Sequence, residues 1–444
     1  MTQPASDLLR AETALRAGRF AEADGLAQAV LARMPSHPGA KALRGAALLA
    51  QGNPQAALPL LRAAIGVPGA PALWHDHLRQ ACQRCLLFDE AVAAARGALR
   101  CAPDDPAMLA GLGTALAFAG DLTAARVILA EALILRPDDV GARLAHAHAL
   151  LAAGRWAEGW PGYEWRLKAL ARPLTALPGP VWDGSRLDGM LALVSEQGFG
   201  DALQFARYIP QLAARCDGVA IACQAGLIDL FRALPGVRAC VSRVSQLPPC
   251  AAHLSFGSLP GMFGATPSQV LGGSASSGGY IAADPALIAA WRPRLGQGRR
   301  VGLVWAGNPE NRADSRRSID LAMLQPVLNR HDVQFVALQK GAPPSDRMIL
   351  ADRGIIDLSD ELTDFAQTAA VVAQLDLVIS VDSAVAHLAG ALGRPVWVLL
   401  MEPADWRWLQ VRADSPWYPS ARLFRQPAPG AWPEVIAAVA AALG

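Results

Sequence analysis

A 34-residue period runs through the first 170 residues of this 444-residue chain without insertion or deletion. The five units begin at Asp7, Lys41, His75, Leu109 and Arg143. This repetition predicts a stack of helix pairs, because each pair can bury its apolar face only against its neighbours. A turn glycine recurs in four units, with Leu86 in its place in the third, and a small residue follows five positions later: Gly18, Gly52, Gly120 and Gly154, then Ala23, Ala57, Ala91, Ala125 and Gly159.

Three of the units also end in a proline, at Pro35, Pro103 and Pro137, where a second helix would stop. The period, the turn glycine, the small residue and the terminal proline together resemble a tetratricopeptide array over residues 1–170. The resemblance implies a superhelix whose concave groove binds a peptide or protein segment. The alternative is a spacer or dimerisation element, since the sequence does not identify the side chains that contact a partner.

Composition narrows the class of protein. The chain is 52% hydrophobic and 18% charged, which predicts two or three globular units. Its 40 basic and 38 acidic residues are mixed along the sequence, so neither nucleic acid nor an anionic membrane is an expected partner. The Cys82–Cys85 pair lacks a second pair to complete a zinc site, and we expect no metal. Without a signal peptide or a transmembrane segment, a cytoplasmic location is expected.

The remainder of the chain begins with a change of pattern. Residues 171–186 include three prolines and break the helical period, which predicts a stiff linker. Apolar strands then alternate with helices, predicted at 201–216 and 227–234, as in parallel sheets covered on both faces. We therefore predict two Rossmann-like domains, 187–285 and 286–444, with a Gly/Ser-rich loop at 272–279. The predicted strands are 191–195, 218–223, 301–305, 333–338, 377–381 and 395–400.

Ligands of such domains bind at the carboxyl ends of the strands. The segment 377–390 carries the clearest signal, because an apolar strand stops at Asp382 and Ser383 and is followed by a helix of small residues. The first amides of that helix are available to a phosphate group. This pattern is typical of a nucleotide-sugar pocket.

Several short motifs resemble, in order and spacing, the bacterial tetratricopeptide glycosyltransferases, whose catalytic part is similar to the heptosyltransferases of glycosyltransferase family nine. With the array, the resemblance covers nearly the whole chain. It implies a tetratricopeptide superhelix followed by a GT-B fold of two Rossmann-like domains, with an acceptor side at 187–285 and a donor side at 286–444. The motifs are 196–208, 258–260, 305–308 with 316–319, 382–390, and 405–408 with 415–418.

The same resemblance implies an inverting transferase that moves a sugar from a nucleotide-sugar co-substrate, with no cofactor, to a protein held by the repeat groove. Flagellin or another surface protein is the acceptor that similar proteins indicate. The chain carries no DxD triplet or two-metal carboxylate cluster, which favours a metal-independent reaction. Two alternatives are transfer to a lipid-linked saccharide, as in heptosyltransferases, and a non-catalytic scaffold.

Asp201 is the candidate catalytic residue. It follows Gly198 and Gly200, which we expect to allow a tight bend and close approach of a ligand. The resemblance implies that Asp201 is the base that deprotonates the acceptor hydroxyl. An aspartate here can also cap a helix, and both roles can hold together.

The donor-side candidates are cationic or lie at a helix start. Arg316 and Arg317 can neutralise a diphosphate, or they can belong to a solvated loop. The resembling proteins have Lys-Arg here, so Arg316 departs from the pattern and leaves the donor's identity open. At the other motif, Asp382, Ser383 and Ala384 end a strand, and the following helix is expected to present its amides to phosphate, with Ser383 adding a hydroxyl donor.

Other candidates follow from position in the predicted cleft. The resemblance makes His387 a donor contact, although a histidine on an apolar helix can equally be a core residue. Trp406, with neighbouring aromatic residues, can stack on a base or sugar, or fill a core or interdomain seam. Glu196 and Asn308 are polar residues at predicted strand ends and are expected to line the cleft.

Overall fold

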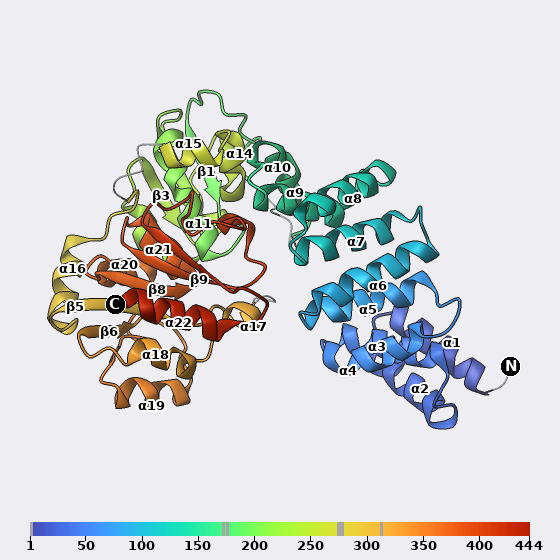
Figure 1. Cartoon of the computed structure of the whole chain (residues 1–444). Helices are drawn as coiled ribbons and strands as arrows, with labels where there is room; N and C mark the ends of the chain where they lie inside the picture. Colours follow the sequence, from blue (N-terminus) through green and yellow to red (C-terminus); the bar gives the residue numbers. More distant parts are fainter. Residues whose placement is uncertain (1–2, 171–173, 175–176, 273–278, 311–313) are drawn as a thin grey trace. The chain divides into compact units, whose positions relative to one another are not determined.

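The computed structural model describes residues 3–170, 174, 177–272, 279–310 and 314–444 (Figure 1). The chain divides into two compact units, Met1–Leu150 and Leu151–Gly444. Parts of the predicted linker (171–173 and 175–176) and most of the predicted Gly/Ser-rich loop (273–278) lie outside the described residues.

The first unit is a succession of antiparallel helix pairs, as the tetratricopeptide period predicts (Figure 1). The turn glycines adopt positive φ, for example 86° at Gly120, and Leu86 is held at φ 62° in the equivalent turn. The small residues Ala23, Ala57, Ala91 and Ala125 are fully buried. The helices are α1 (Gln3–Arg16), α2 (Phe20–Arg33), α3 (Pro38–Ala50), α4 (Pro54–Ile65), α5 (Ala72–Arg84), α6 (Phe88–Cys101), α7 (Pro106–Phe118), α8 (Leu122–Leu135) and α9 (Val140–Ala152), which crosses into the second unit.

The second unit contains two parallel sheets, and the predicted fold class is confirmed. The first sheet has the order β3-β2-β1-β4 and the second the order β10-β9-β8-β5-β6-β7. The strands are β1 (Met190–Val194), β2 (Gly218–Ala222), β3 (Val237–Val241), β4 (Ala252–Ser255), β5 (Arg299–Val304), β6 (Val333–Ala337), β7 (Ile356–Asp357), β8 (Leu377–Val381), β9 (Val396–Leu400) and β10 (Ala421–Arg425).

Helices cover both faces of the second sheet (Figure 1). One face packs its apolar side chains, such as Val301 and Ile379, against Val435 and Val439 of the last helix. The helices of the unit are α10 (Trp156–Tyr163), α11 (Phe199–Phe205), α12 (Ile209–Ala213), α13 (Ile228–Arg232), α14 (Leu259–Met262), α15 (Pro267–Gly272), α16 (Pro285–Trp291), α17 (Asp314–Arg317), α18 (Gln325–Leu328), α19 (Pro344–Asp352), α20 (Phe365–Val372), α21 (Ala384–Ala391) and α22 (Trp432–Leu443).

Short 3₁₀ turns complete the unit: η1 (Glu164–Leu167), η2 (Ala206–Tyr208), η3 (Ala225–Leu227), η4 (Val244–Gln246), η5 (Phe256–Ser258), η7 (Arg292–Arg294), η8 (Leu321–Leu324) and η9 (Trp406–Trp408). One of them, η2, interrupts the helix predicted over 201–216, which the structure divides into α11, η2 and α12. Pro210 lies in the first turn of α12, where its missing N–H costs least, and so restarts the helix.

Two segments of the second unit that precede β1 in the chain pack against its sheets. Trp182 donates from its backbone to the carbonyl of His253 over 2.9 Å, which extends the first sheet beside β4. Helix α10, the second helix of the fifth repeat, lies beside α14 (Figure 1). There the Trp160 indole donates to the carbonyl of Ala265 over 2.8 Å. The last repeat helix therefore shares its core with the α/β sheets.

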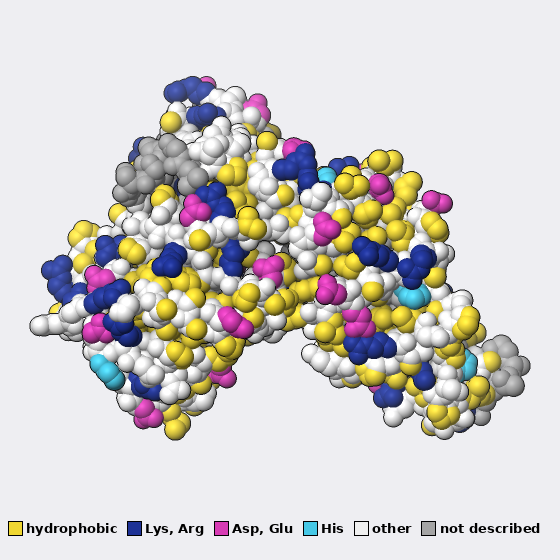
Figure 2. Space-filling model, viewed as in Figure 1, with side chains coloured by type: hydrophobic (Ala, Val, Ile, Leu, Met, Phe, Trp, Pro, Cys, Tyr) yellow, Lys and Arg dark blue, Asp and Glu magenta, His cyan; other side chains and the backbone are white. Residues whose placement is uncertain are grey.

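The surface agrees with the mixed composition. Figure 2 shows lysine and arginine interspersed with acidic side chains over the face in view. No helix in the described part of the chain combines the length and the apolar character needed to cross a bilayer.

Candidate functional site

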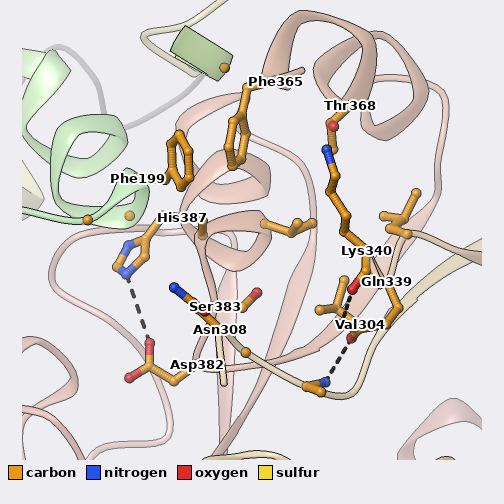
Figure 3. A pocket seen from close by; sticks show the side chains of 18 of the residues that line it. Phe199, Val304, Asn308, Gln339, Lys340, Phe365, Thr368, Asp382, Ser383 and His387 are labelled. Atoms are coloured by element: carbon orange, nitrogen blue, oxygen red, sulfur yellow. Dashed lines mark hydrogen bonds and ion pairs between the residues drawn. The ribbon is translucent and has the colours of Figure 1, made fainter. Parts of the chain in front are cut away.

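A cavity of about 620 Å³ opens at the carboxyl ends of the parallel strands, with walls from both sheets. The segment after β1 supplies Gln197–Asp201, and the segments after β5 and β8 supply Asn308 and Asp382–His387. Figure 3 shows Asn308, Asp382, Ser383 and His387 along one side of this pocket. The carboxyl edge is where the sequence pattern places a ligand.

Helix α21 starts at the pocket wall. Ser383 is its N-cap, and the first residues of the helix, Ala384 and Val385, line the cavity. The first amides of a helix have no acceptor within it, and they carry the positive end of its dipole. The Ser383 hydroxyl also lies 2.8 Å from that of Ser380. This end of the pocket is therefore suited to an anionic group.

Two titratable side chains flank the start of α21. Burial, reinforced by Asp405 and opposed by Arg317, raises the pKa of Asp382 to about 6. Burial and the charge of Arg407 lower the pKa of His387 to about 3, so its imidazole is neutral at physiological pH. The His387 Nδ1 atom lies 2.8 Å from the Tyr418 hydroxyl, and Nε2 lies 3.9 Å from Asp382 (Figure 3). His387 is thus both buried in the core and exposed to the pocket on one side.

The two candidate arginines on α17 diverge. Arg317 lines the pocket and forms an ion pair with Asp314 over 3.2 Å. Arg316 instead turns towards the carbonyl of Glu402, to which it donates over 3.3 Å. Burial lowers the pKa of Arg316 from its ordinary value. The pair is therefore not a single diphosphate clamp in this structure, and only Arg317 faces the cavity.

Asp201 lies in the first turn of α11, at the edge of the pocket. One of its carboxylate oxygens, Oδ2, accepts from the Gly198 amide over 3.0 Å. The other, Oδ1, forms an ion pair with Arg407. Asp201 is therefore not the N-cap of α11, which is Gly198. It accepts from the N-cap amide at the third helical position while it lines the cavity.

The two glycines before Asp201, expected to allow a tight bend and close approach of a ligand, both line the cavity. Gly198 has φ −71°, which any residue can adopt. At Gly200, a Cβ atom would lie 2.7 Å from Cδ2 of His387. This glycine therefore allows α11 and α21 to approach each other across the two sheets.

Two cleft candidates lie elsewhere. The Glu196 side chain, expected to line the cleft, is fully buried and pairs with Arg166 over 2.9 Å. Trp406 packs edge-on against Trp160 and Tyr163, with ring centroids 5.6 Å away in both cases. Trp406 therefore packs in an interior seam, the second of the two roles that the sequence allows. The aromatic surface that it contacts comes from α10, which no local sequence pattern indicates.

The pocket also contains residues that the sequence reasoning missed. Lys340 follows β6 and reaches along the wall towards Thr368 (Figure 3). Lysine is rare in this chain, since Lys41, Lys168 and Lys340 are the only lysines among its 40 basic residues. This rarity is the sequence signal that could have identified Lys340 as a candidate. Arg407 lies between Trp406 and Trp408 in the 405–408 motif, where the sequence predicts a role for the aromatic residues but not for the arginine.

An aromatic pair also lines the pocket. Phe199 of α11 and Phe365 of α20 face each other with ring centroids 5.0 Å apart (Figure 3). Phe199 belongs to the helix that follows β1 of the first sheet, and Phe365 belongs to a helix of the second sheet. Both residues line the cavity. Flat apolar faces of this kind suit a sugar ring or a nucleobase.

Comparison with known proteins follows the same division of the chain. Residues 361–415 match glycosyltransferase family 9 (heptosyltransferase), and residues 8–71 and 87–140 match the tetratricopeptide repeat. Over 426 residues the chain is 30% identical to Protein FlbA of Caulobacter vibrioides (strain ATCC 19089 / CIP 103742 / CB 15), a match that covers 87% of this chain and 69% of FlbA.

Solved structures match over part of the chain. A crystal structure of MamA protein is 16% identical, covers 38% of this chain and 92% of its own, and has a TM-score of 0.33. A thermophilic tetratricopeptide protein of Thermus thermophilus is 25% identical, covers 34% of this chain and 82% of its own, and has a TM-score of 0.30.

Proposed function

The chain belongs to the family of tetratricopeptide-repeat proteins with a glycosyltransferase family 9 (heptosyltransferase) region, and we propose that it transfers a sugar from a nucleotide-sugar donor to a hydroxyl group of a protein acceptor. The repeat array would recruit that acceptor. A surface protein such as flagellin is the candidate to test first.

One observation supports this proposal most strongly: a carboxylate and an anion-binding helix start line the same cavity. Asp201 comes from the first sheet's side, and Arg317 and the start of α21 come from the second sheet's side. A sugar bound between them has a base on one side and a diphosphate site on the other. This is the arrangement that an inverting displacement requires.

The proposed reaction has a simple balance. The acceptor oxygen attacks the anomeric carbon while its proton passes to the Asp201 carboxylate. The bond from that carbon to the diphosphate oxygen breaks, and the nucleoside diphosphate leaves. Arg317 and the first amides of α21 stabilise the negative charge that develops on the leaving group, which needs no metal ion. Neutral His387 can donate a hydrogen bond without adding charge.

The nucleoside would extend from the diphosphate site along the wall after β6. Lys340 and Thr368 supply polar groups there, and Phe365 supplies an aromatic face. The Lys340 ammonium has three donors and suits a phosphate or hydroxyl oxygen. We assign these residues to the donor rather than to the acceptor, because all three lie on the second sheet's side.

Donor binding can be tested by thermal shift with a panel of nucleoside diphosphates and nucleotide sugars. One nucleotide family should raise the melting temperature of the wild type, and Arg317→Ala should abolish the shift. The matched control is Arg347→Ala, which removes an exposed arginine of α19 that pairs with Asp360. This variant should keep the thermal shift. If Arg317→Ala binds as tightly as the wild type, the assigned diphosphate site is wrong.

Catalysis can be tested with Asp201→Asn, which keeps the size of the side chain. The variant should bind the donor but lose transfer to purified candidate acceptors, by roughly a hundredfold or more, the range ascribed to a general base. Loss of donor binding together with transfer would show a structural role instead. A folded wild type that binds no nucleotide would favour the scaffold function.

A further inference from the structure

We propose that helix α10, the second helix of the fifth repeat, is part of the catalytic centre, with Tyr163 acting as a positioning residue for Asp201. Tyr163 lies at the end of α10, is buried, and has its hydroxyl in contact with Gln197, which lines the pocket. The inference rests on the proposed role of Asp201 as the base, and it extends that role to a residue that the repeat pattern assigns to the array.

The first connection runs through Gln197, which follows β1. Its amide lies between the Tyr163 hydroxyl and Asp201. When the nitrogen is turned towards Asp201, both the amide nitrogen and the amide oxygen have suitable hydrogen-bond partners. In that orientation it donates to Oδ1 of Asp201 over 3.0 Å, and its oxygen accepts from the Tyr163 hydroxyl over 2.8 Å. Burial raises the pKa of Tyr163 to about 12, so the phenol keeps the proton that it donates.

The second connection runs through Arg407 of η9. Its guanidinium pairs with Asp201 and also with Asp405 over 2.8 Å. The Tyr163 hydroxyl lies 3.4 Å from the same guanidinium nitrogen that contacts Asp201. Burial opposes the charge on Arg407, but the two carboxylates outweigh it and raise its pKa above the ordinary value. Tyr163 thus contacts both groups that orient the Asp201 carboxylate.

Helix α10 is held firmly enough to serve as a support. Trp156 stacks on Trp417 with ring centroids 4.6 Å apart, and Trp160 packs against Trp406. Immediately after the helix, Arg166 pairs with the buried Glu196 and donates to the Ser258 hydroxyl over 2.8 Å. These contacts join α10 to the segments that follow β1, β4 and β9. A displacement of α10 would therefore move the Asp201 network.

A general base works only when its carboxylate faces the hydroxyl within hydrogen-bond distance. Tyr163 does not line the cavity, so it acts through Gln197 and Arg407 and is not itself a catalytic residue. Its loss should lower the rate of the chemical step without weakening donor binding. An effect on kcat alone distinguishes positioning from a contribution to the pocket wall.

The test compares Tyr163→Phe with Tyr208→Phe. Tyr208 is also buried, and its hydroxyl has no hydrogen-bond partner among the residues that the structure describes. In an assay of sugar release from the donor, Tyr163→Phe should lower kcat roughly three- to tenfold with donor KM unchanged, which is the loss of about one hydrogen bond. Tyr208→Phe should match the wild type. Equal kcat values in both variants and the wild type would overturn the proposal.

Substitutions at Arg407 test the second connection. Arg407→Gln removes both the cation and the fork that hold Asp201, whereas Arg407→Lys keeps the charge but not the fork. Both variants should lower kcat, and the loss should be larger in Arg407→Gln. A kcat of Arg407→Gln equal to that of the wild type would contradict the assigned network.

A measurement without substrate separates this inference from the proposed function. Thermal unfolding of Tyr163→Phe, Asp201→Asn and the double variant forms a cycle. If the network couples the two sites, the shift of the double variant should differ from the sum of the single shifts. Additive shifts would overturn the network even if transfer is observed. Coupled shifts in a protein that neither binds nor cleaves any donor would support the network and reject the transferase.

Discussion

Helices α8 and α10 hold the same place in successive repeats, but they differ in what surrounds them. α8 leaves Val127 and Ile134 largely exposed, the latter at 77%. α10 buries Trp156, Trp160 and Tyr163 against the α/β sheets. The period therefore specifies the helix and its turn, whereas the outward side chains determine whether the helix serves the array or the site. Helix α10, the last helix of the repeats, therefore packs as part of the second unit.

The same contrast applies to charge. In the first unit, the Arg62–Glu90 pair is substantially exposed, and such pairs contribute little to stability. Around α10, ionised groups are buried, as in Arg166 with Glu196 and Arg407 with Asp201. Burying charge is costly unless every partner is present. The buried pairs around α10 join segments that are distant in sequence, whereas the largely buried Arg79–Asp76 pair of the first unit lies within one helix.

The largest effect should come from breaking the buried pair next to α10. Arg166→Ala leaves the fully buried Glu196 carboxylate without its cation, at an expected cost of about 3–5 kcal/mol in the free energy of unfolding. Arg155→Ala, at the start of the same helix, removes an exposed pair with Glu158 and should cost less than about 1 kcal/mol. Denaturant unfolding measures both, and equal costs would remove the contrast.

The next prediction concerns the small residue of the repeat. Ala125→Leu overfills a fully buried position in α8 and should destabilise the first unit by about 1–3 kcal/mol. Ala157→Leu adds the same atoms to the exposed side of α10 and should change stability by no more than about 0.5 kcal/mol. Thermal unfolding followed by circular dichroism compares them. A tolerant Ala125 would mean that the repeat helices are loosely packed.

A smaller and pH-dependent effect is expected at Asp382. Because its pKa is raised to about 6 in the folded chain, the folded state holds its proton more tightly than the unfolded state does. Stability is therefore lost as the pH rises towards and through about 6. At pH 7, Asp382→Asn should raise the free energy of unfolding by about 1–2 kcal/mol and the melting temperature with it. At pH 4 the substitution should have little effect on either. A gain independent of pH would exclude this cause.

The smallest effect should come from the irregular turn in the array. Leu86 occupies the left-handed region at φ 62°, where the other repeats have glycine. Leu86→Gly removes that strain and should stabilise the protein by less than about 1 kcal/mol, after the loss of some packing. The reciprocal change, Gly120→Leu, should destabilise it by about 1–2 kcal/mol. Differential scanning calorimetry of the two variants checks that the signs are opposite.

The array was predictable because its information is local. A turn glycine and a small residue repeat at a fixed spacing, and the structure places Gly120 and Ala125 accordingly. The strands were predictable for a similar reason, since each is a short apolar run between helices. The break at Pro210 has a local cause as well, but the helical periodicity around it obscured that signal.

The site was only partly predictable, because its decisive contacts are distant in sequence. Arg407 and Asp201 are 206 residues apart, and neither local pattern indicates the other. A polar residue at a strand end can face the cavity, as Asn308 does, or the interior, as Glu196 does. Which of these two orientations a side chain adopts depends on a partner such as Arg166, which the repeat pattern assigns to the array. The composition carried one unused signal, the rarity of lysine.

The most direct test of the account is a crystal structure of the full chain with the nucleoside diphosphate that gives the largest thermal shift. We predict a diphosphate within hydrogen-bond distance of Arg317 and the first amides of α21, with the nucleoside towards Lys340 and Phe365. A diphosphate bound away from α21, or an empty pocket at saturating nucleotide, would contradict it.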